Sequence, residues 1–142
     1  FELGYVDHAQ EVAILSEQNK VHPIETLTPC VNLKDVLIIK KLTSDIRISN
    51  ELKGYIVNLI RATRDNQDVL NGASPRASLA LMKAAQVLAL FDGMEFVTPD
   101  HIQEIAIPVI AHRLMLNSQA KFSGRTAKII VEDVLKEIPV PT

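Results

Sequence analysis

The chain has 142 residues, of which 47% are hydrophobic, 23% are charged and 4% are aromatic, and its formal net charge at pH 7 is -2. This slightly acidic balance argues against a surface that coats nucleic acid or anionic lipid, and the single cysteine, Cys30, excludes an internal disulfide and a cysteine-based metal cage. No stretch approaches roughly 18 consecutive apolar residues, so we expect one helical domain that lies in the cytoplasm and inserts into no membrane.

The N-terminal part of the sequence predicts two helices joined by a surface loop. Asp7 and Gln10 have the spacing of a capping box, which would start a helix over about 8–18. Two prolines and many polar residues then interrupt the periodicity. A second helix is expected over about 33–41, with Asn32 as its cap.

The clearest amphipathic pattern predicts a third helix over about 50–64, opened by Ser49. Its apolar residues recur at i, i+3, i+4, i+7 and i+8, and they are Leu52, Tyr55, Ile56, Leu59 and Ile60. Arg61 and Arg64 fall in its last turn, where cations complement the helix dipole. That placement is a sufficient structural reason for both arginines; the alternative is that one of them adds charge to a nucleotide pocket or a neighbouring subunit.

The stretch from Gly72 to Gly93 predicts a helix with clear signals at both ends. Ser74 suits the N-cap, Pro75 the first helical position, and Gly93 a left-handed residue after the C-terminus. Because nearly every residue between them is apolar, we expect this helix to be buried in the middle of a bundle. Arg76 is the exception, since it places a cation in the first turn, where the helix already carries partial positive charge.

Two interpretations of Arg76 stay open at this point. An anion at that helix end would remove the mismatch, because free N–H groups, the dipole and a guanidinium together suit a phosphate. Alternatively, the side chain covers apolar surface or pairs with a carboxylate from another helix.

The C-terminal part predicts two more helices. Thr-Pro-Asp at 98–100 is a strong helix start, and Pro108 is expected to kink or break the helix that follows. A polar loop is expected over 117–124, and a last amphipathic helix over about 126–137.

Two short segments, 46–48 and 95–97, have extended character and each lies just before a helix cap, so they could pair as a minimal two-stranded ribbon. Residues 65–71 are expected to form a polar loop. The predicted fold is therefore mainly all-α, a compact bundle of about five to six helices.

A self-contained catalytic motif is missing from the sequence. It has no Gly-x-x-x-x-Gly-Lys-Ser/Thr loop, no acidic strand end for magnesium and no Gly-x-Gly-x-x-Gly. Its four histidines share no i, i+4 spacing, so no metal site is expected, and Cys30 has no adjacent base. The chain is not expected to hydrolyse a nucleotide alone.

Gly72-Ala73-Ser74-Pro75-Arg76-Ala77, followed by an Ala/Leu-rich helix and Val97-Thr98-Pro99-Asp100, resembles the helical lid domain of the MoxR family of AAA+ ATPases. The resemblance implies that Arg76 is the sensor 2 residue, which reaches the terminal phosphates of ATP, with Pro75 and Tyr5 beside the nucleotide. It also implies that 1–142 is a single lid domain of a larger ATPase. The α/β core of that ATPase, which is absent here, would carry the phosphate loop and the magnesium.

The resemblance begins at the N-terminal junction, where the family commonly has Gly-Tyr-Pro. This chain has Gly4-Tyr5-Val6, so its hinge between core and lid is expected to be less rigid.

The family resemblance also implies partners. The parent protein would form a ring, commonly a hexamer, with ATP at the subunit boundaries. It would have a chaperone-like role in assembling or maturing other proteins, often with von Willebrand factor A domains. The alternative is a stand-alone helical module that binds protein or nucleic acid through a basic cluster of Lys121, Arg125 and Lys128, although the acidic balance of the chain weighs against nucleic acid.

Overall fold

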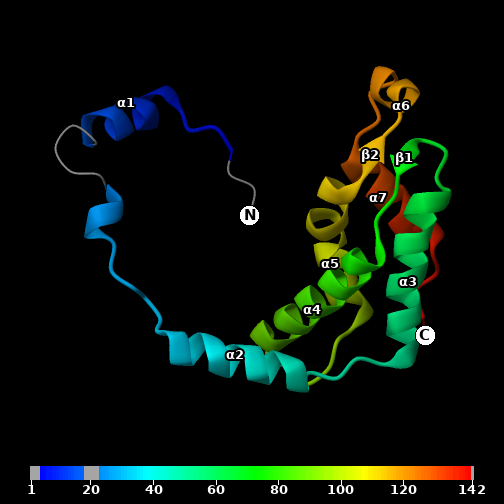
Figure 1. Cartoon of the computed structure of the whole chain (residues 1–142), viewed down its shortest axis with the longest axis horizontal. Helices are drawn as coiled ribbons and strands as arrows, with labels where there is room; N and C mark the ends of the chain where they lie inside the picture. Colours follow the sequence, from blue (N-terminus) through cyan, green and yellow to red (C-terminus); the bar gives the residue numbers. More distant parts are fainter. Residues whose placement is uncertain (1–3, 18–22, 142) are drawn as a thin grey trace. The chain divides into compact units, whose positions relative to one another are not determined.

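The computed structural model describes residues 4–17 and 23–141. The chain divides into two units, Phe1–Ile38 and Ile39–Thr142. Helix α2 (Leu33–Asp45) crosses that division, and the seven α-helices of the described residues are labelled in Figure 1. The mainly α-helical fold class is therefore confirmed.

The first unit contains α1 (His8–Glu17), a 3-10 helix η1 (Pro23–Thr26) and the start of α2. The predicted capping box is present, because the Gln10 N–H donates to Asp7 Oδ1 at 2.8 Å and the Asp7 N–H donates to Gln10 Oε1 at 3.2 Å. The predicted last residue of this helix, 18, lies outside the described residues. None of the α1 residues is buried.

Helix α2 begins with the predicted cap. The Asp35 N–H donates to Asn32 Oδ1 at 3.1 Å, and the Asn32 N–H donates to Asp35 Oδ2 at 3.0 Å. The helix continues to Asp45, four residues beyond the predicted end at 41.

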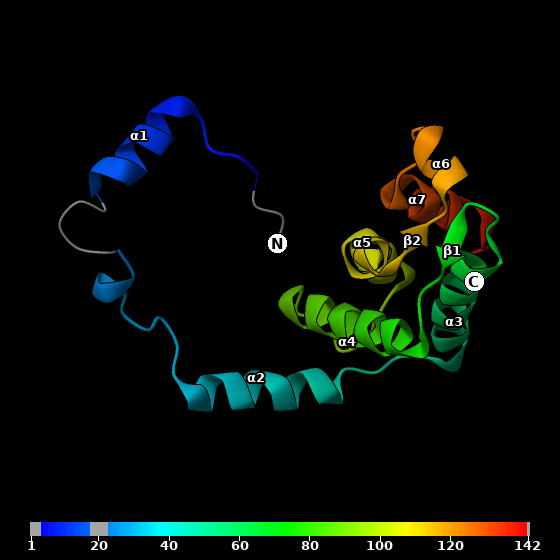
Figure 2. The same cartoon turned by 45° about the horizontal axis from the view of Figure 1, so that its top comes forward.

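The second unit is built around four helices: α3 (Asn50–Asp65), α4 (Pro75–Phe91), α5 (Pro99–Ile110) and α7 (Ala127–Glu137). Helix α4 packs against α3 and α5, and α7 packs against the same two helices from another side (Figures 1 and 2). The largest fully buried apolar side chains come from all four helices: Leu59, Ile60, Leu81, Ile102, Ile110, Ile130, Val131 and Val134.

Helix α4 has the predicted bounds, and Gly93 has the predicted left-handed conformation with φ of 70°. The expectation that it is buried in the middle of the bundle is wrong. Only one stripe, with residues spaced by four, is buried: Ala77, Leu81, Ala85 and Ala89. Leu79 and Phe91 are 57% and 71% exposed, because α3 and α5 cover only one side of the helix.

The two-stranded sheet forms elsewhere than predicted. Strands β1 (Val69–Asn71) and β2 (Met115–Leu116) pair antiparallel, with Val69 opposite Leu116. The predicted ribbon of 46–48 with 95–97 is only a single parallel bridge, in which the Arg47 N–H donates to Glu95 O and the Val97 N–H donates to Arg47 O. The prediction of a loop over 65–71 is therefore wrong for its last three residues, which form β1.

The prediction of a polar loop over 117–124 is also wrong in part, because α6 (Ser118–Phe122) forms there. The Asn117 side chain caps it by accepting from the Ala120 N–H at 2.8 Å, and Gly124, with φ of 76°, follows its end. Pro108 lies inside α5, which ends two residues later and continues as the 3-10 helix η2 (Ala111–Arg113).

His101 joins the end of α4 to the start of α5. Its Nδ1 accepts from the Thr98 N–H at 3.0 Å, which assigns the ring proton to Nε2, and Nε2 lies 3.1 Å from Asp92 Oδ2. His101 thus lies in the first turn of α5 and is buried.

Leu81 and Leu79 provide a matched pair of core and surface positions on α4. Because Leu81 is fully buried, Leu81→Ala is expected to lower the free energy of unfolding by about 2–5 kcal/mol. Leu79→Ala changes helix propensity equally and should cost less than about 0.5 kcal/mol. Urea unfolding of both variants measures the difference, and equal losses would contradict the one-sided burial of α4.

Candidate functional site

Arg76 lies in the first turn of α4 with its side chain exposed to solvent. The ion pairs of the described residues join other groups, and none of them includes Arg76. Of the two interpretations open from the sequence, pairing with a carboxylate from another helix is therefore not observed in residues 4–17 and 23–141. The guanidinium is free to meet a ligand.

The N-terminus of α4 has no side-chain cap. Ser74 has the extended conformation of an N-cap residue, with φ of -87° and ψ of 169°, but its hydroxyl makes no capping hydrogen bond. Ser49 and Thr126, in contrast, cap α3 and α7 with their hydroxyls. Because Pro75 has no N–H and the Ala77 N–H donates to the Ser74 carbonyl at 2.8 Å, an acceptor from outside would meet the Arg76 amide, next to the Arg76 side chain.

The last turn of α3 holds the segment that leads into α4. Arg64 Nε donates to the Ala73 carbonyl at 2.7 Å. A Cβ on Gly72 would lie 2.7 Å from both Cα and Cγ of Arg64, so only glycine allows the two backbones to approach this closely. Arg64 thus has a structural role that differs from the predicted interaction with the helix dipole.

A hollow of about 310 Å³ brings three of the predicted residues together at this end of α3 and α4. Its lining includes Pro75, Arg61 and Arg64, and it is completed by Val57, Ile60, Asp65 and Ser78. Arg76 is next to Pro75 in the chain but does not line this hollow. Arg61, Arg64 and the start of α4 therefore form one positively charged region, and Asp65 is the acidic residue in its lining.

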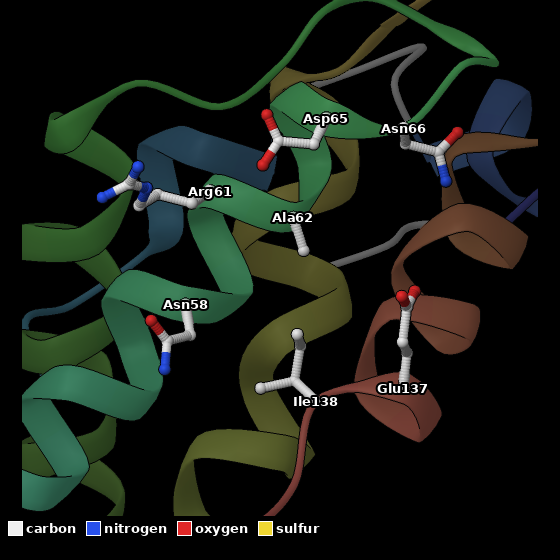
Figure 3. A pocket seen from close by; sticks show the side chains of 7 residues that line it. All are labelled: Asn58, Arg61, Ala62, Asp65, Asn66, Glu137 and Ile138. Atoms are coloured by element: carbon white, nitrogen blue, oxygen red, sulfur yellow. The ribbon is translucent and has the colours of Figure 1, made fainter.

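Arg61 also lines a second hollow, of about 370 Å³, between the end of α3 and the end of α7. Figure 3 shows the Arg61 side chain extending away from Glu137 and Ile138, which lie on the opposite side of this hollow. Its lining mixes one cation with two carboxylates, Asp65 and Glu137, so it has less anion-binding character than the hollow beside Pro75.

Tyr5 lies in the first unit and is fully exposed there. Its predicted place beside a nucleotide stays a prediction.

The basic cluster near α7 is largely neutralised. Arg125 pairs with Asp68 at 3.1 Å and with Asp133 at 2.8 Å, and its hydrogen bond with Asp133 is the main cause that raises the pKa of its guanidinium. Lys128 lies 3.9 Å from Glu132. Lys121 is the one member of the cluster outside the ion pairs of the described residues, so the pairing reduces the free charge on which a nucleic-acid-binding surface would depend.

Two further classes of site are not found among the residues that the structure describes. No group of three His, Cys, Asp or Glu side chains is placed to hold a metal ion. Within the same ranges, no helix has the length and apolar character that a membrane span requires.

Comparisons with known proteins agree on one family. The model of the AAA lid domain matches residues 61–134. The uncharacterized protein YeaC of Bacillus subtilis is 40% identical over 139 residues, which make up 98% of this chain and 43% of that protein. Chaperone MoxR1 of Mycobacterium tuberculosis is 31% identical over 148 residues, covering 98% of this chain and 39% of that protein.

A solved structure gives the same result. The crystal structure of a candidate ATPase from Cytophaga hutchinsonii matches with a TM-score of 0.79 and 28% identity, over 99% of this chain and 45% of that one. The chain thus spans less than half the length of each of these relatives.

Gly72 and Gly54 test the contact between α3 and the segment before α4. Gly72→Ala is expected to lower the free energy of unfolding by about 1–3 kcal/mol, because its Cβ would overlap the Arg64 backbone. A Cβ on Gly54, inside α3, would meet no atom of another element within 4 Å, so Gly54→Ala should stabilise by about 0.5–1 kcal/mol. Thermal unfolding distinguishes the two, and a stabilising Gly72→Ala would refute the close approach.

Proposed function

The chain belongs to the AAA lid domain family of MoxR-like AAA+ ATPases, and we propose that it acts as the sensor 2 lid of such an enzyme, with Arg76 as the arginine that contacts ATP. In this proposal the lid closes over ATP and couples its hydrolysis to domain motion.

The observation that carries the proposal is the state of the α4 N-terminus. Arg76 is exposed and has no ion pair among the described residues, and Ser74 leaves the first turn without a side-chain cap. A guanidinium, the Arg76 amide and a helix dipole at one point match a phosphate in charge and geometry. This end of the helix therefore fits the terminal phosphates of ATP.

The chemical role of Arg76 would be electrostatic. Its guanidinium would donate to the oxygens of the γ-phosphate, over which negative charge spreads during transfer. Helix α4 packs against both α3 and α5, so a change in the contact at Arg76 would move the three helices together. Loss of the γ-phosphate would release this contact, so hydrolysis would loosen the lid.

The remaining parts of the site would come from outside the chain. An α/β core in the same protein would hold most of the ATP together with magnesium, and Pro75 and Tyr5 would lie beside the nucleotide. Residues 1–142 would then be one lid domain. A phosphate-binding loop in the reading frame upstream of this sequence is the feature that this proposal requires.

The proposal extends to the assembly. The parent protein would form a cytoplasmic ring, in the family usually a hexamer, with a chaperone-like role in assembling or maturing other proteins. The name of the relative from Mycobacterium tuberculosis, Chaperone MoxR1, supports that role. Proteins with von Willebrand factor A domains would be partners.

The decisive variant is Arg76→Ala in the full-length protein. Loss of one donor to the transferred phosphoryl group is expected to lower kcat for ATP hydrolysis by roughly tenfold to a hundredfold, while folding is preserved because the side chain is exposed. Lys83, also exposed and two turns along the same helix, is the matched control, and Lys83→Ala should keep normal turnover. Unchanged turnover in Arg76→Ala would refute the proposal.

The 142-residue chain alone should not bind ATP to a measurable degree. One arginine and one helix end offer too few contacts to offset the cost of immobilising the nucleotide. Isothermal titration of this chain with ATP tests the expectation, and a saturable signal would show that the lid carries more of the binding site than we propose.

A further inference from the structure

Thr63 is the one wholly buried polar side chain among the described residues, and it lies in the last turn of α3. Its hydroxyl donates to the Ile60 carbonyl at 2.7 Å and accepts from the Ala73 N–H at 3.1 Å. One hydroxyl thereby joins the backbone of α3 to the segment that leads into α4. The bond to the Ile60 carbonyl is one that a threonine inside a helix commonly makes. The bond from the Ala73 N–H, in contrast, joins residues ten apart in the chain.

Two consecutive side chains of α3 hold both polar backbone groups of Ala73. Thr63 accepts from its N–H, and the Arg64 Nε donates to its carbonyl at 2.7 Å. Ala73 is itself buried, so its N–H has no water to replace a lost partner. The orientation of this residue is therefore fixed on both sides.

The chain between Ala73 and Arg76 has little freedom to absorb a change at Ala73. Ser74 is extended, Pro75 has its φ angle fixed by its ring, and Arg76 is already helical. The direction in which α4 leaves this point, and with it the position of the Arg76 guanidinium, follows from how Ala73 is held.

We propose that Thr63 is a positioning residue for Arg76, acting through its hydrogen bond to the Ala73 N–H. This inference rests on the proposed function, because it assigns Thr63 a role in ATP turnover that is exerted only through the sensor 2 arginine. A catalytic group that is displaced by much less than the length of a side chain already lowers the rate of a reaction in which that group must be oriented toward the reacting atoms.

Two substitutions separate the hydroxyl from the shape of the side chain. Thr63→Val keeps the branched shape but removes the hydroxyl, leaving the Ala73 N–H buried without an acceptor. Thr63→Ser keeps the hydroxyl and loses only a methyl group. A positioning role requires that serine restores what valine loses.

The experiment measures kcat for ATP hydrolysis by the full-length protein with five variants: Thr63→Val, Thr63→Ser, Arg76→Ala, the double variant of Thr63→Val with Arg76→Ala, and Val131→Ala. Thr63→Val is expected to lower kcat about tenfold, and Thr63→Ser by less than about twofold. In the Arg76→Ala background, Thr63→Val should cause no further loss, because the group that it positions is gone. Val131→Ala, which creates a core cavity in α7 away from Ala73, is the control for general destabilisation and should leave kcat unchanged.

A second readout does not depend on ATP. Hydrogen exchange of the backbone amides over 72–78, measured by mass spectrometry on the full-length protein, should accelerate at least about tenfold in Thr63→Val but stay normal in Thr63→Ser and Val131→Ala.

The possible results have distinct meanings. If Arg76→Ala lowers turnover and Thr63→Val does not, or if the two losses multiply in the double variant, the positioning role is wrong while the proposed function stands. If Arg76→Ala leaves turnover unchanged, the proposed function fails, and this inference fails with it. Normal exchange over 72–78 in Thr63→Val would also overturn the inference, because the segment would then be held without the hydroxyl.

Discussion

The close packing of α4 against α3 and α5 is the interaction on which the second unit depends. The buried stripe of α4 consists of one leucine and three alanines, Ala77, Ala85 and Ala89, and such small side chains let helix backbones approach one another. Both ends of α4 are then tied to its neighbours, at Ala73 by the side chains of α3 and at Asp92 by His101 of α5. A helix held along one face and at both ends would move together with its neighbours, as the proposed response to Arg76 requires.

Local signals in the sequence predicted most of the helices and their ends. The capping pairs Asp7 with Gln10 and Asn32 with Asp35 form because residues three apart at a helix start can reach each other's backbone amides. Gly93 has the predicted positive φ because few other residues adopt that conformation without strain. Such features depend on neighbours within a few residues, and the pattern of the sequence contains them directly.

Most of the errors have a common physical cause, because they depend on residues that are distant in the chain; the short helix α6, with its local Asn117 cap, is the exception. The strands β1 and β2 are too short to show alternation, and β2 pairs with residues more than forty positions earlier. The apolar side of α4 could not be divided into buried and exposed parts before its neighbours were placed. The sequence pattern contains no signal for the role of Thr63, because its second partner, Ala73, lies in the next segment of the chain.

The start of α4 breaks two local rules at the same place. A cation in the first turn opposes the helix dipole at a cost of about 0.3–1 kcal/mol, and an N-cap serine whose hydroxyl makes no capping hydrogen bond forgoes roughly 1 kcal/mol. Elsewhere in the second unit, the hydroxyls of Ser49 and Thr126 do cap their helices. A bound phosphate would act on both effects at once, because it would accept from the Arg76 amide and neutralise the Arg76 side chain. The local instability of this helix end without a ligand is therefore what would make its position sensitive to the γ-phosphate.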